Sequence, residues 1–233
     1  MFLFSLLFFS SSFTTEVFVR KYFIVWNVGQ GQWTTWTDAT KCLHFDRGGE
    51  FFPQKKASKL CQQKEQRMFV SHWDWDHVGG IGALSKTSCL EKPPLGRSSK
   101  RKEKLIQGFS RCSDNTDLVT TWIPRLSKIS NANSQVFKIQ NVLIPGDSTI
   151  AEENRWSHEV PLQDVGILVL GHHGSRTSTS ENLLKAMPHL KHAVSSARWR
   201  RYKHPHAEII SRLQRYKIPL LRTEDWGNIW FEQ

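Results

Sequence analysis

The stretch SHWDWDHVGG, residues 71–80, is the feature that most constrains the fold and chemistry of this chain. It follows a short apolar run, RMFVS (67–71), and holds two histidines and two aspartates within six positions. Alternate side chains of an extended segment share one face, and imidazole nitrogen and carboxylate oxygen together suit zinc, manganese or iron. The stretch therefore predicts a metal-binding loop at a strand end, rather than an exposed polar turn, formed by His72, Asp74, Asp76 and His77.

Three later segments carry side chains of the same kind. LIPGDS places Asp147 directly after an apolar strand, where a carboxylate can bridge two metal ions. GHHGSRTSTS places His172 and His173 at the end of another strand, beside several hydroxyl side chains. KHPHAEI adds His204 and His206 before a helix, where they either contact a substrate phosphate or cap that helix. Because loops at strand ends are where functional sites are usually built, we expect these segments to form one site.

The pattern of apolar and turn residues predicts an α/β fold with a large β core. Strands outnumber helices, and the two alternate to the end of the chain. We expect strands at 17–26, 33–36, 42–46, 67–71, 118–123, 135–140, 142–147, 166–175, 191–196, 218–223 and 228–231. We expect helices at 54–66, 78–84, 181–187 and 207–216, and a basic loop at 92–104.

The charge balance points to a polyanionic partner. The 233 residues, enough for one sizeable core, have a formal net charge of +11. Such a balance suits nucleic acid or an anionic membrane surface. Within the basic loop, the segment 97–104 either contacts backbone phosphates or is a solvated loop, and we favour the solvated loop.

The four cysteines are widely spaced, with no C-x-x-C pair: Cys42, Cys61, Cys89 and Cys112. This spacing argues against a zinc knuckle and against a dithiol redox centre. One or two disulfides would form in an oxidising compartment, but we favour buried free thiols.

The chain opens on an apolar segment, residues 1–15, that is too short to span a bilayer, which takes about 20 residues. No lysine or arginine precedes Arg20 and no A-x-A cleavage site follows, so the segment departs from an ordinary signal peptide. It is a weak export signal, the stub of a membrane helix or a short anchor. Each alternative places the remaining domain, 16–233, beside or beyond a membrane.

The ordered motifs resemble the metallo-β-lactamase superfamily, and in particular the hydrolase domain of ComEC-type DNA-internalisation competence proteins. The resemblance runs over about residues 20–231 and implies a four-layer αββα sandwich with metals at one edge of the packed sheets. It is carried by NVGQGQ, SHWDWDHVGG, NANSQVFKIQ, LIPGDS, GHHGSRTSTS, KHPHAEIISRL and LLRTEDWGNIWF.

The resemblance also implies roles for single residues. One metal ion would be held by His72, Asp74 and Asp147, and a second by Asp76, His77, Asp147 and either His172 or His173. The implied catalytic residues are Asp76 and His173. The implied substrate-binding residues are Ser175, Thr177, Ser178, His204 and His206. The implied supporting residues are Asn27, Gln30 and Asn133.

This sequence departs from the pattern of the family at several positions. Asp74 replaces the second histidine of the common H-x-H-x-D-H motif, and no histidine lies between His77 and His158. The first site is therefore richer in oxygen, which favours manganese or magnesium or weakens that site. Asn27 and Gln32 stand where aspartates are usual, which would lower activity if those positions orient the ligands.

The sequence thus predicts a metal-dependent phosphodiester hydrolase with two divalent ions, zinc or manganese, and no nucleotide cofactor. The expected activity is that of a nuclease linked to DNA uptake, with DNA and a membrane channel or uptake machinery as partners, outside the cytoplasm or at the membrane. One alternative is a hydrolase of another phosphodiester, such as a cell-wall or phospholipid headgroup. A second is a non-catalytic DNA-binding module. Trp73 and Trp75 either pack beneath the loop or face a nucleotide base.

Overall fold

The computed structural model describes residues 20–233. The apolar segment 1–15, with its predicted signal or anchor, lies outside the described residues. The strands are β1 (Tyr22–Val25), β2 (Thr34–Thr37), β3 (Lys41–Phe45), β4 (Glu65–Phe69), β5 (Cys89–Lys92), β6 (Val119–Trp122), β7 (Val136–Ile139), β8 (Val142–Ile144), β9 (Ile167–Val169), β10 (His192–Ser195), β11 (Leu220–Arg222) and β12 (Ile229–Glu232). The α-helices are α1 (Gln54–Leu60), α2 (Trp75–Val78), α3 (Lys100–Ile106), α4 (Ile150–Trp156), α5 (Glu181–Ala186), α6 (Trp199–Tyr202), α7 (Ala207–Arg215) and α8 (Thr223–Trp226). The 3-10 helices are η1 (Ile81–Leu84), η2 (Asn131–Asn133) and η3 (Gly171–Gly174).

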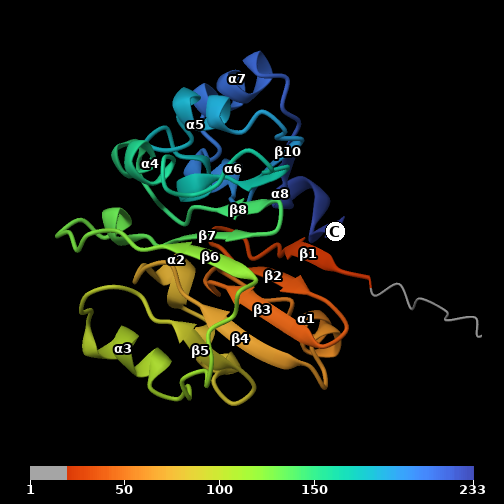
Figure 1. The fold of residues 1–233 in the computed structure, drawn as a ribbon, viewed down its shortest axis with the longest axis vertical. Helices are drawn as coiled ribbons and strands as arrows, with labels where there is room; N and C mark the ends of the chain where they lie inside the picture. Colours follow the sequence, from red (N-terminus) through yellow and green to blue (C-terminus); the bar gives the residue numbers. More distant parts are fainter. Residues whose placement is uncertain (1–19) are drawn as a thin grey trace, which may run out of the picture.

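The strands form two six-stranded sheets that pack face to face (Figure 1). The first has the order β12-β1-β2-β3-β4-β5, and the second has the order β11-β10-β9-β8-β7-β6. β12 closes the first sheet by pairing antiparallel with β1 at the opposite end of the sequence. Within each sheet some neighbours run parallel, including β3 with β4 and β8 with β9. Parallel neighbours end at the same edge, so the loops that follow them lie together.

Alternating side chains decide which face of each strand packs inward. In β1, Phe23 and Val25 enter the core between the sheets, whereas Ile24 faces the outer cluster beneath α1. In β8, Val142 and Ile144 likewise point between the sheets. The outer face of the second sheet packs against α4, α5 and α7, and that of the first sheet against α1, α2, η1 and α3 (Figure 1). This arrangement confirms the predicted α/β four-layer sandwich.

Several local predictions differ from the structure. The basic segment 92–104 is not wholly a loop, because α3 begins at Lys100, where the hydroxyl of Ser99 accepts from the backbone N–H of Lys102. The predicted helix 78–84 is instead the end of α2 followed by the separate 3-10 helix η1. α4 was not predicted. Its apolar residue Trp156 is buried against the second sheet, a contact that the mixed local sequence does not reveal.

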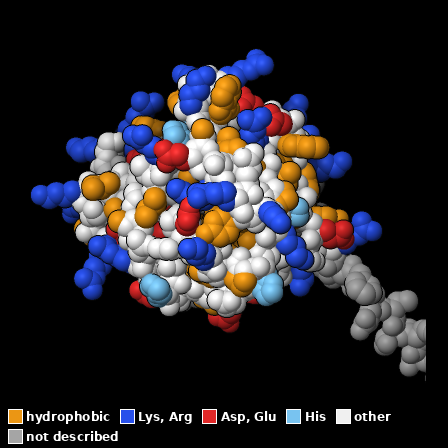
Figure 2. All heavy atoms as spheres, turned by 90° about the horizontal axis from the view of Figure 1, so that it is seen from above, with side chains coloured by type: hydrophobic (Ala, Val, Ile, Leu, Met, Phe, Trp, Pro, Cys, Tyr) orange, Lys and Arg blue, Asp and Glu red, His pale blue; other side chains and the backbone are white. Residues whose placement is uncertain are grey.

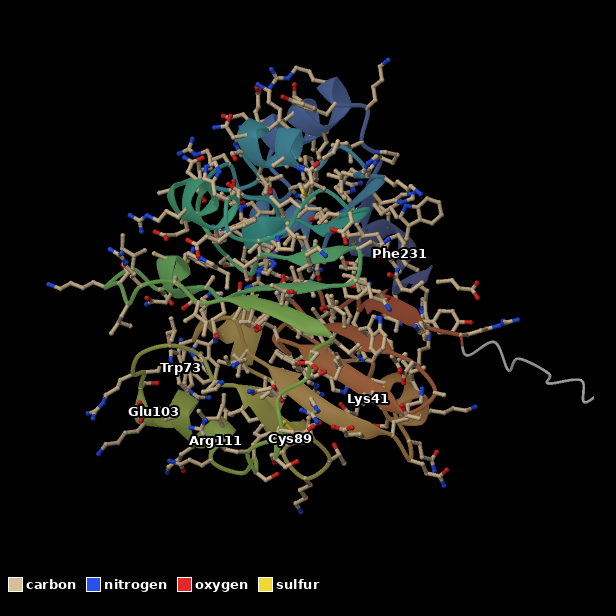
Figure 3. All side chains as sticks on the ribbon, in the orientation of Figure 1. Lys41, Trp73, Cys89, Glu103, Arg111 and Phe231 are labelled. Atoms are coloured by element: carbon tan, nitrogen blue, oxygen red, sulfur yellow. A yellow bond between two sulfur atoms is a disulfide. The ribbon has the colours of Figure 1, made fainter. Side chains whose placement is uncertain are left out.

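The expectation of free thiols is wrong: the cysteines form two disulfides, Cys42–Cys61 and Cys89–Cys112. The first joins β3 to the end of α1, and the second joins β5, labelled at Cys89 in Figure 3, to the segment after α3. The Cα atoms are 5.8 and 5.0 Å apart, within the range of disulfides. Each disulfide joins a strand to a segment outside the strands, a proximity that arises in the folded chain and that the sequence spacing could not show.

None of the helices between residues 20 and 233 combines the length and the apolar character that crossing a bilayer requires.

Candidate metal centre

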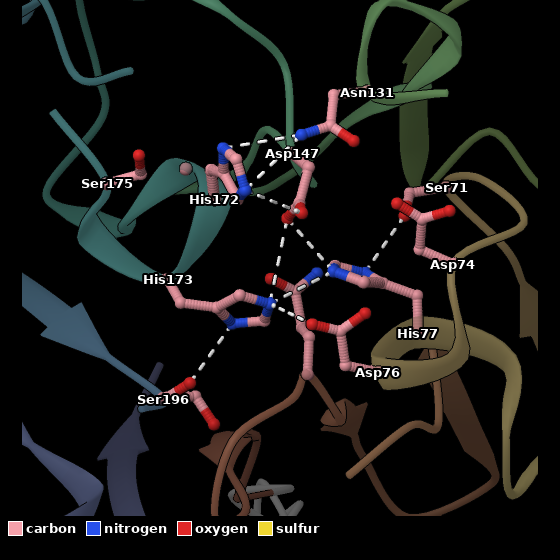
Figure 4. A network of polar contacts seen from close by, with 12 residues as sticks. Ser71, Asp74, Asp76, His77, Asn131, Asp147, His172, His173, Ser175 and Ser196 are labelled. Carbon is pink, nitrogen blue, oxygen red and sulfur yellow. Dashed lines mark hydrogen bonds and ion pairs between the residues drawn. The ribbon is translucent and has the colours of Figure 1, made fainter. Parts of the chain in front are cut away.

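The loops that follow β4, β8 and β9 meet at one edge of the sandwich (Figure 4). The first contributes SHWDWDH, the second contributes Asp147, and the third is η3 with its two histidines. The predicted segments therefore do come together, although they belong to different sheets. Most of the central side chains are buried: His72, His77, Asp147 and His173 are each at most 3% exposed.

Asp147 lies at the middle of this cluster, with one carboxylate oxygen on each side. Its Oδ1 is 2.9 Å from Nε2 of His77 and 3.8 Å from Nε2 of His173. Its Oδ2 is 3.8 Å from Nε2 of His72 and 3.7 Å from Nε2 of His172. A carboxylate in this position is placed to face two cations at once.

Hydrogen bonds from outside the cluster determine how the imidazole of His77 presents its nitrogens. Its Nδ1 is 2.7 Å from Oδ2 of Asp46, a fully buried carboxylate that also accepts from the backbone N–H and hydroxyl of Ser71 and from Nε2 of Gln32. A carboxylate only accepts, so Nδ1 of His77 carries the proton. The lone pair of the neutral ring then lies on Nε2, which faces Asp147.

Hydrogen bonds to Nδ1 orient the other two buried histidines in the same way. Because the Ser71 hydroxyl donates to Asp46, its oxygen accepts from Nδ1 of His72 over 3.0 Å. Nδ1 of His173 donates to the backbone carbonyl of Ser196 over 3.1 Å. Both rings therefore also turn an Nε2 lone pair toward the centre. Such outer partners are what orient histidines that bind metals.

Without a cation, these groups would repel one another. Nε2 of His77 and Nε2 of His173 are only 3.3 Å apart, and the buried Nε2 of His72 and Oδ1 of Asp147 have no hydrogen-bond partner. Buried polar atoms are normally satisfied, so this donor set fits a divalent cation. Within residues 20–233, the groups that could hold an ion are His72, His77 and Asp147, and Asp76, His77 and His173.

The charge states agree with this interpretation. Burial alone would raise the pKa of the Asp147 carboxyl, but the imidazoles of His77 and His173 hold it well below its ordinary value. Burial alone would lower the pKa of His77, but the carboxylates of Asp147 and Asp46 raise it well above its ordinary value. A proton on Nε2 is one way to relieve the repulsion, and a metal ion is the other, because metal binding releases protons.

Asp74, Asp76 and His172 lie nearer the surface. Oδ2 of Asp76 is 3.2 Å from Nε2 of His173, and Oδ2 of Asp74 is 3.5 Å from Nε2 of His72. Oδ1 of Asp74 accepts from the hydroxyl of Ser130. The ring of His172, in contrast to buried His173, is partly exposed at the rim. This position gives the two histidines of the pair different environments.

Glycines let the surrounding loops approach closely. A Cβ on Gly48 would lie 2.0 Å from the carbonyl carbon of Asp76, so only glycine fits there. The backbone N–H of Gln32 donates to the carbonyl of Asp76, and that of Arg47 donates to the carbonyl of His77. The NVGQGQ turn thus supports the DWDH loop through its backbone, and the Gln32 side chain adds the hydrogen bond to Asp46.

Three residues at the centre adopt a left-handed backbone: Asp46 (φ 53°), His172 (φ 49°) and His173 (φ 55°). This conformation is uncommon for residues other than glycine. Residues held in it cluster at functional sites, where surrounding structure enforces the geometry. The turn of η3 directs its two histidines to different sides of Asp147.

The remaining predicted residues lie at varying distances from the centre. Thr177 contacts Nδ1 of His172 and the hydroxyl of Ser175, and the ring of His204 is 6.1 Å from that of His172. The buried hydroxyl of Ser178 instead donates to the carbonyl of Gly171 within the turn. His206 caps α7 by accepting from the N–H of Glu208, which was one of its two predicted roles.

The three predicted supporting residues hold loops rather than ligands. Asn27 accepts from the N–H of Gly29, Gln30 accepts from the N–H of Arg198, and Asn133 is bonded to the backbone of Ser127. The asparagine that reaches the centre is Asn131, whose amide lies 3.3 Å from His172. Sequence reasoning also missed Asp46, Ser71, Asn131 and Ser196. Only Asp46 had a usable signal, since it ends the apolar strand CLHFD.

Comparison with solved structures identifies the fold. The chain matches no protein-family profile. Among solved structures it is similar to the metallo-β-lactamase fold protein YhfI from Bacillus subtilis, with a TM-score of 0.61 over 91% of this chain and 100% of that one, at 9% identity. The chain has the metallo-β-lactamase fold. A diphosphatase of the PhnP family shares this fold, with a TM-score of 0.52 over 88% of this chain and 85% of that one, at 11% identity.

Sequence similarity links this metallo-β-lactamase fold chain to competence proteins. Recombination protein 2 of Haemophilus influenzae is 26% identical over 226 residues, which cover 87% of this chain. Competence protein ComA of Neisseria gonorrhoeae is 29% identical over 228 residues, which cover 89% of this chain. The chain spans only 28% and 31% of the length of these two relatives. The predicted resemblance is confirmed, at low identity.

Proposed function

We propose that this chain is a metal-dependent phosphodiester hydrolase that cleaves DNA during its uptake. The observation that carries the proposal is the convergence of three Nε2 lone pairs, from His72, His77 and His173, on the carboxylate of Asp147. Similarity to a recombination protein and a competence protein supports DNA as the substrate. The shared fold of a diphosphatase supports hydrolysis of a phosphate ester or anhydride.

The two sides of Asp147 suggest two ion sites. Oδ2 of Asp147, with His72 and Asp74, would hold one ion, and Oδ1, with Asp76, His77 and His173, would hold the other. His172 then belongs to the rim on the first side. When bound, divalent ions such as zinc or manganese lower the pKa of a coordinated water and stabilise the charge that develops on a phosphodiester.

The residues of the chain supply charge and orientation at the centre. Asp76 is ionised, because the partnership with His173 and the charge of His77 overcome burial and lower the pKa of its carboxyl. It reaches the surface from the buried cluster, so this carboxylate can orient an attacking water by accepting a hydrogen bond from it. Nδ1 of His173 donates to the carbonyl of Ser196, and its Nε2, which carries the lone pair, lies 3.2 Å from Oδ2 of Asp76, so both groups face the same ion position.

The rim of the centre offers contacts for a phosphate. Thr177 and Ser175 present hydroxyls beside His172, and His204 lies beyond them. Lysine and arginine side chains project around most of the face shown in Figure 2, with acidic side chains in smaller groups between them. This distribution suits a polyanionic substrate such as DNA.

Two further features support a position outside the cytoplasm, at or beyond a membrane. Both disulfides would be stable in an oxidising compartment, and disulfides are rare in the cytosol. The competence relatives point to a DNA-uptake apparatus as partner.

The test is a nuclease assay combined with metal analysis. Purified protein is loaded with Mn²⁺ or Zn²⁺, its metal content is measured by mass spectrometry, and it is mixed with single- and double-stranded DNA. We expect about two ions per chain and DNA cleavage that the double substitution Asp76→Ala/His77→Ala abolishes. Asp117→Ala/His158→Ala, which removes the same residue types from exposed positions, is the matched control.

Each alternative has its own outcome in this assay. DNA binding that survives EDTA, without any product under any metal, would indicate a non-catalytic binding module. Hydrolysis of a phospholipid or cell-wall diester, with DNA left intact, would indicate a different substrate. Cleavage unchanged by the double substitution would show that the activity comes from a contaminant.

A further inference from the structure

We propose that residues 198–203, RWRRYK, form a binding surface for single-stranded nucleic acid beside the metal centre, an inference that rests on the proposed function. The six residues include four cations and two aromatic rings, and all six are exposed. They comprise α6 and the residues that flank it. We call this segment the basic-aromatic segment.

Both ends of the basic-aromatic segment are tied to the histidine turn of the centre. Before it, the carbonyl of Ser196 accepts from Nδ1 of His173. After it, the ring of His204 lies 6.1 Å from that of His172, and the N–H of His206 donates to the carbonyl of Gly174. The segment therefore has a defined position next to the reacting groups, which favours a role in holding the substrate.

Contacts from two loops of the first sheet and from α8 hold the segment in place. Oε1 of Gln30 accepts from the N–H of Arg198, and the carboxylate of Glu224 accepts from the N–H of Trp199. The carboxylate of Glu50 forms ion pairs with Arg198, at 3.1 Å, and with Arg201, at 2.8 Å. A surface that is already ordered loses less entropy when it binds a ligand.

Two cations of the segment remain available to a ligand. In the described part of the chain, no carboxylate lies within ion-pair distance of Arg200 or Lys203, although Glu50 pairs with the two other arginines. Arg200 also borders a surface hollow together with Arg222, whose own acidic partner is Asp225. Cations without an acidic partner are suited to contact backbone phosphates.

The two aromatic rings indicate unpaired bases. The side chains of Trp199 and Tyr202 are 43% and 41% exposed, which is unusual for rings of this size on one short helix. Lys203 lies over the Trp199 ring at 4.5 Å, and Arg201 lies over the Tyr202 ring at 5.2 Å. Exposed rings beside cations form the stacking platforms on which single strands bind. Bases of a duplex are already stacked on one another, so a duplex would gain less.

A similar combination lies beside the other side of the centre. Trp75, which is 43% exposed, lies beneath the cations of Arg101 and Lys102 at 5.0 and 5.4 Å. Lys102 is also 3.9 Å from the carboxylate of Asp74. Trp73, in contrast, is buried in the cluster beneath the loop. Trp75 and its two cations thus offer a second position for stacking beside the centre.

An anionic membrane also attracts arginines and aromatic rings, but it does not explain why the segment is attached to the metal-site histidines at both ends. The test measures binding of the full chain in EDTA, where no turnover occurs. The probes are a fluorescent 20-residue oligo-dT, the same length of duplex, and vesicles with phosphatidylglycerol. We expect the oligo-dT to bind more tightly than the duplex.

Two pairs of substitutions separate stacking from charge. Trp199→Ala/Tyr202→Ala should weaken oligo-dT binding at least tenfold, since each base stacked on a ring contributes about 5–150-fold. Arg200→Ala/Lys203→Ala should reduce the slope of log Kd against log salt by about 1.4, at roughly 0.7 for each phosphate contact with a single strand. The matched controls are Trp230→Ala, a ring that is 45% exposed on β12, and Lys55→Ala/Lys56→Ala on α1.

Oligo-dT affinity that is unchanged by the ring substitutions would overturn the inference. So would a loss confined to vesicle binding, which would assign the segment to a membrane surface. If the binding results are as expected but no metal supports cleavage, the inference stands and the proposed catalysis fails. If cleavage occurs but the ring substitutions leave binding unaffected, the proposed catalysis stands and the inference about the segment fails.

Discussion

Oδ2 of Asp46 lies 2.7 Å from Nδ1 of His77 in a fully buried contact. The aspartate directly follows the strand β3, and the histidine lies in α2, after β4. Asp46 thereby fixes which nitrogen of His77 faces the candidate metal centre, although Asp46 is not itself one of the candidate metal ligands. Its role is to position a ligand.

Replacing Asp46 by asparagine should weaken metal binding about 10–100-fold. One oxygen of the side chain becomes an amide NH₂, which would face the donors of Gln32 and His77. The dissociation constant for Mn²⁺ or Zn²⁺, measured by competition with a chromophoric chelator, checks this prediction. Asp164→Asn, at a largely exposed carboxylate, should leave the constant unchanged. Equal affinity of the Asp46→Asn protein and the wild-type protein would contradict the positioning role.

Asp147 and His72 should differ in how many ions their loss removes. Asp147 faces histidines on both sides, whereas His72 lies on the side of Oδ2 only. We therefore expect Asp147→Ala to lose both ions and His72→Ala to lose one. Metal content after dialysis, measured by mass spectrometry with Asp117→Ala as control, tests this expectation. A full complement of two ions in Asp147→Ala would show that the carboxylate bridges nothing.

Gly48→Ala should destabilise the protein by about 1–3 kcal/mol and reduce its metal content. The new Cβ would lie 2.0 Å from the backbone of Asp76, so the DWDH loop must move. The matched substitution is Gly82→Ala, whose Cβ would meet its nearest neighbour at an ordinary 3.7 Å. Urea unfolding and metal analysis of both variants provide the measurement. Equal stability of the two variants would argue against close loop packing at Gly48.

Protonation of buried His44 should lower the free energy of unfolding at acidic pH. Burial lowers its pKa to about 4, so the unfolded chain binds a proton at higher pH than the folded chain. The contribution of neutral His44 to the free energy of unfolding is complete above about pH 6.5. It is lost as the pH falls toward 4, with a slope of about 1.4 kcal/mol for each pH unit. Burial also lowers the pKa of His172 and His204, which act in the same direction.

Urea unfolding at pH 7 and pH 4.5 tests this pH dependence. Between these two pH values, the free energy of unfolding of His44→Gln should fall by about 2 kcal/mol less than that of the wild-type protein. His158→Gln, at an exposed position, should behave like wild type. The same decrease in all three proteins would assign the acid sensitivity to other groups.

The disulfides should contribute measurably to stability. They join residues 19 and 23 positions apart, and a loop of this length is stabilised by about 3 kcal/mol for each bond. We expect Cys42→Ser/Cys61→Ser and Cys89→Ser/Cys112→Ser each to lower the melting temperature. In protein produced in an oxidising compartment and unfolded without reductant, a thiol reagent should detect no free cysteine. Four reactive thiols would contradict the pairing.

Local sequence was sufficient for the fold class and for the main site. The runs of β-branched, aromatic and apolar residues at β1 and β8 predicted strands of a large β core. The motifs around His72, Asp147 and His173 predicted a site at strand ends, and the structure brings all three together. These features depend on short-range patterns, which sequence shows directly. The basic loop and the helix at 78–84 were less well predicted, since helix ends depend on individual caps and contacts.

The residues that support the site could be identified only in the folded chain. Asp46, Asn131 and Ser196 are separated in sequence from the histidines that they contact, so no local spacing connects them. The disulfide partners likewise meet only because the end of α1 packs beside β3 and the segment after α3 packs beside β5. Residue type and periodicity were enough to predict the candidate metal ligands and the sheet-rich fold. The orientation of each imidazole, and the attachment of the basic-aromatic segment to the centre, arise from long-range packing.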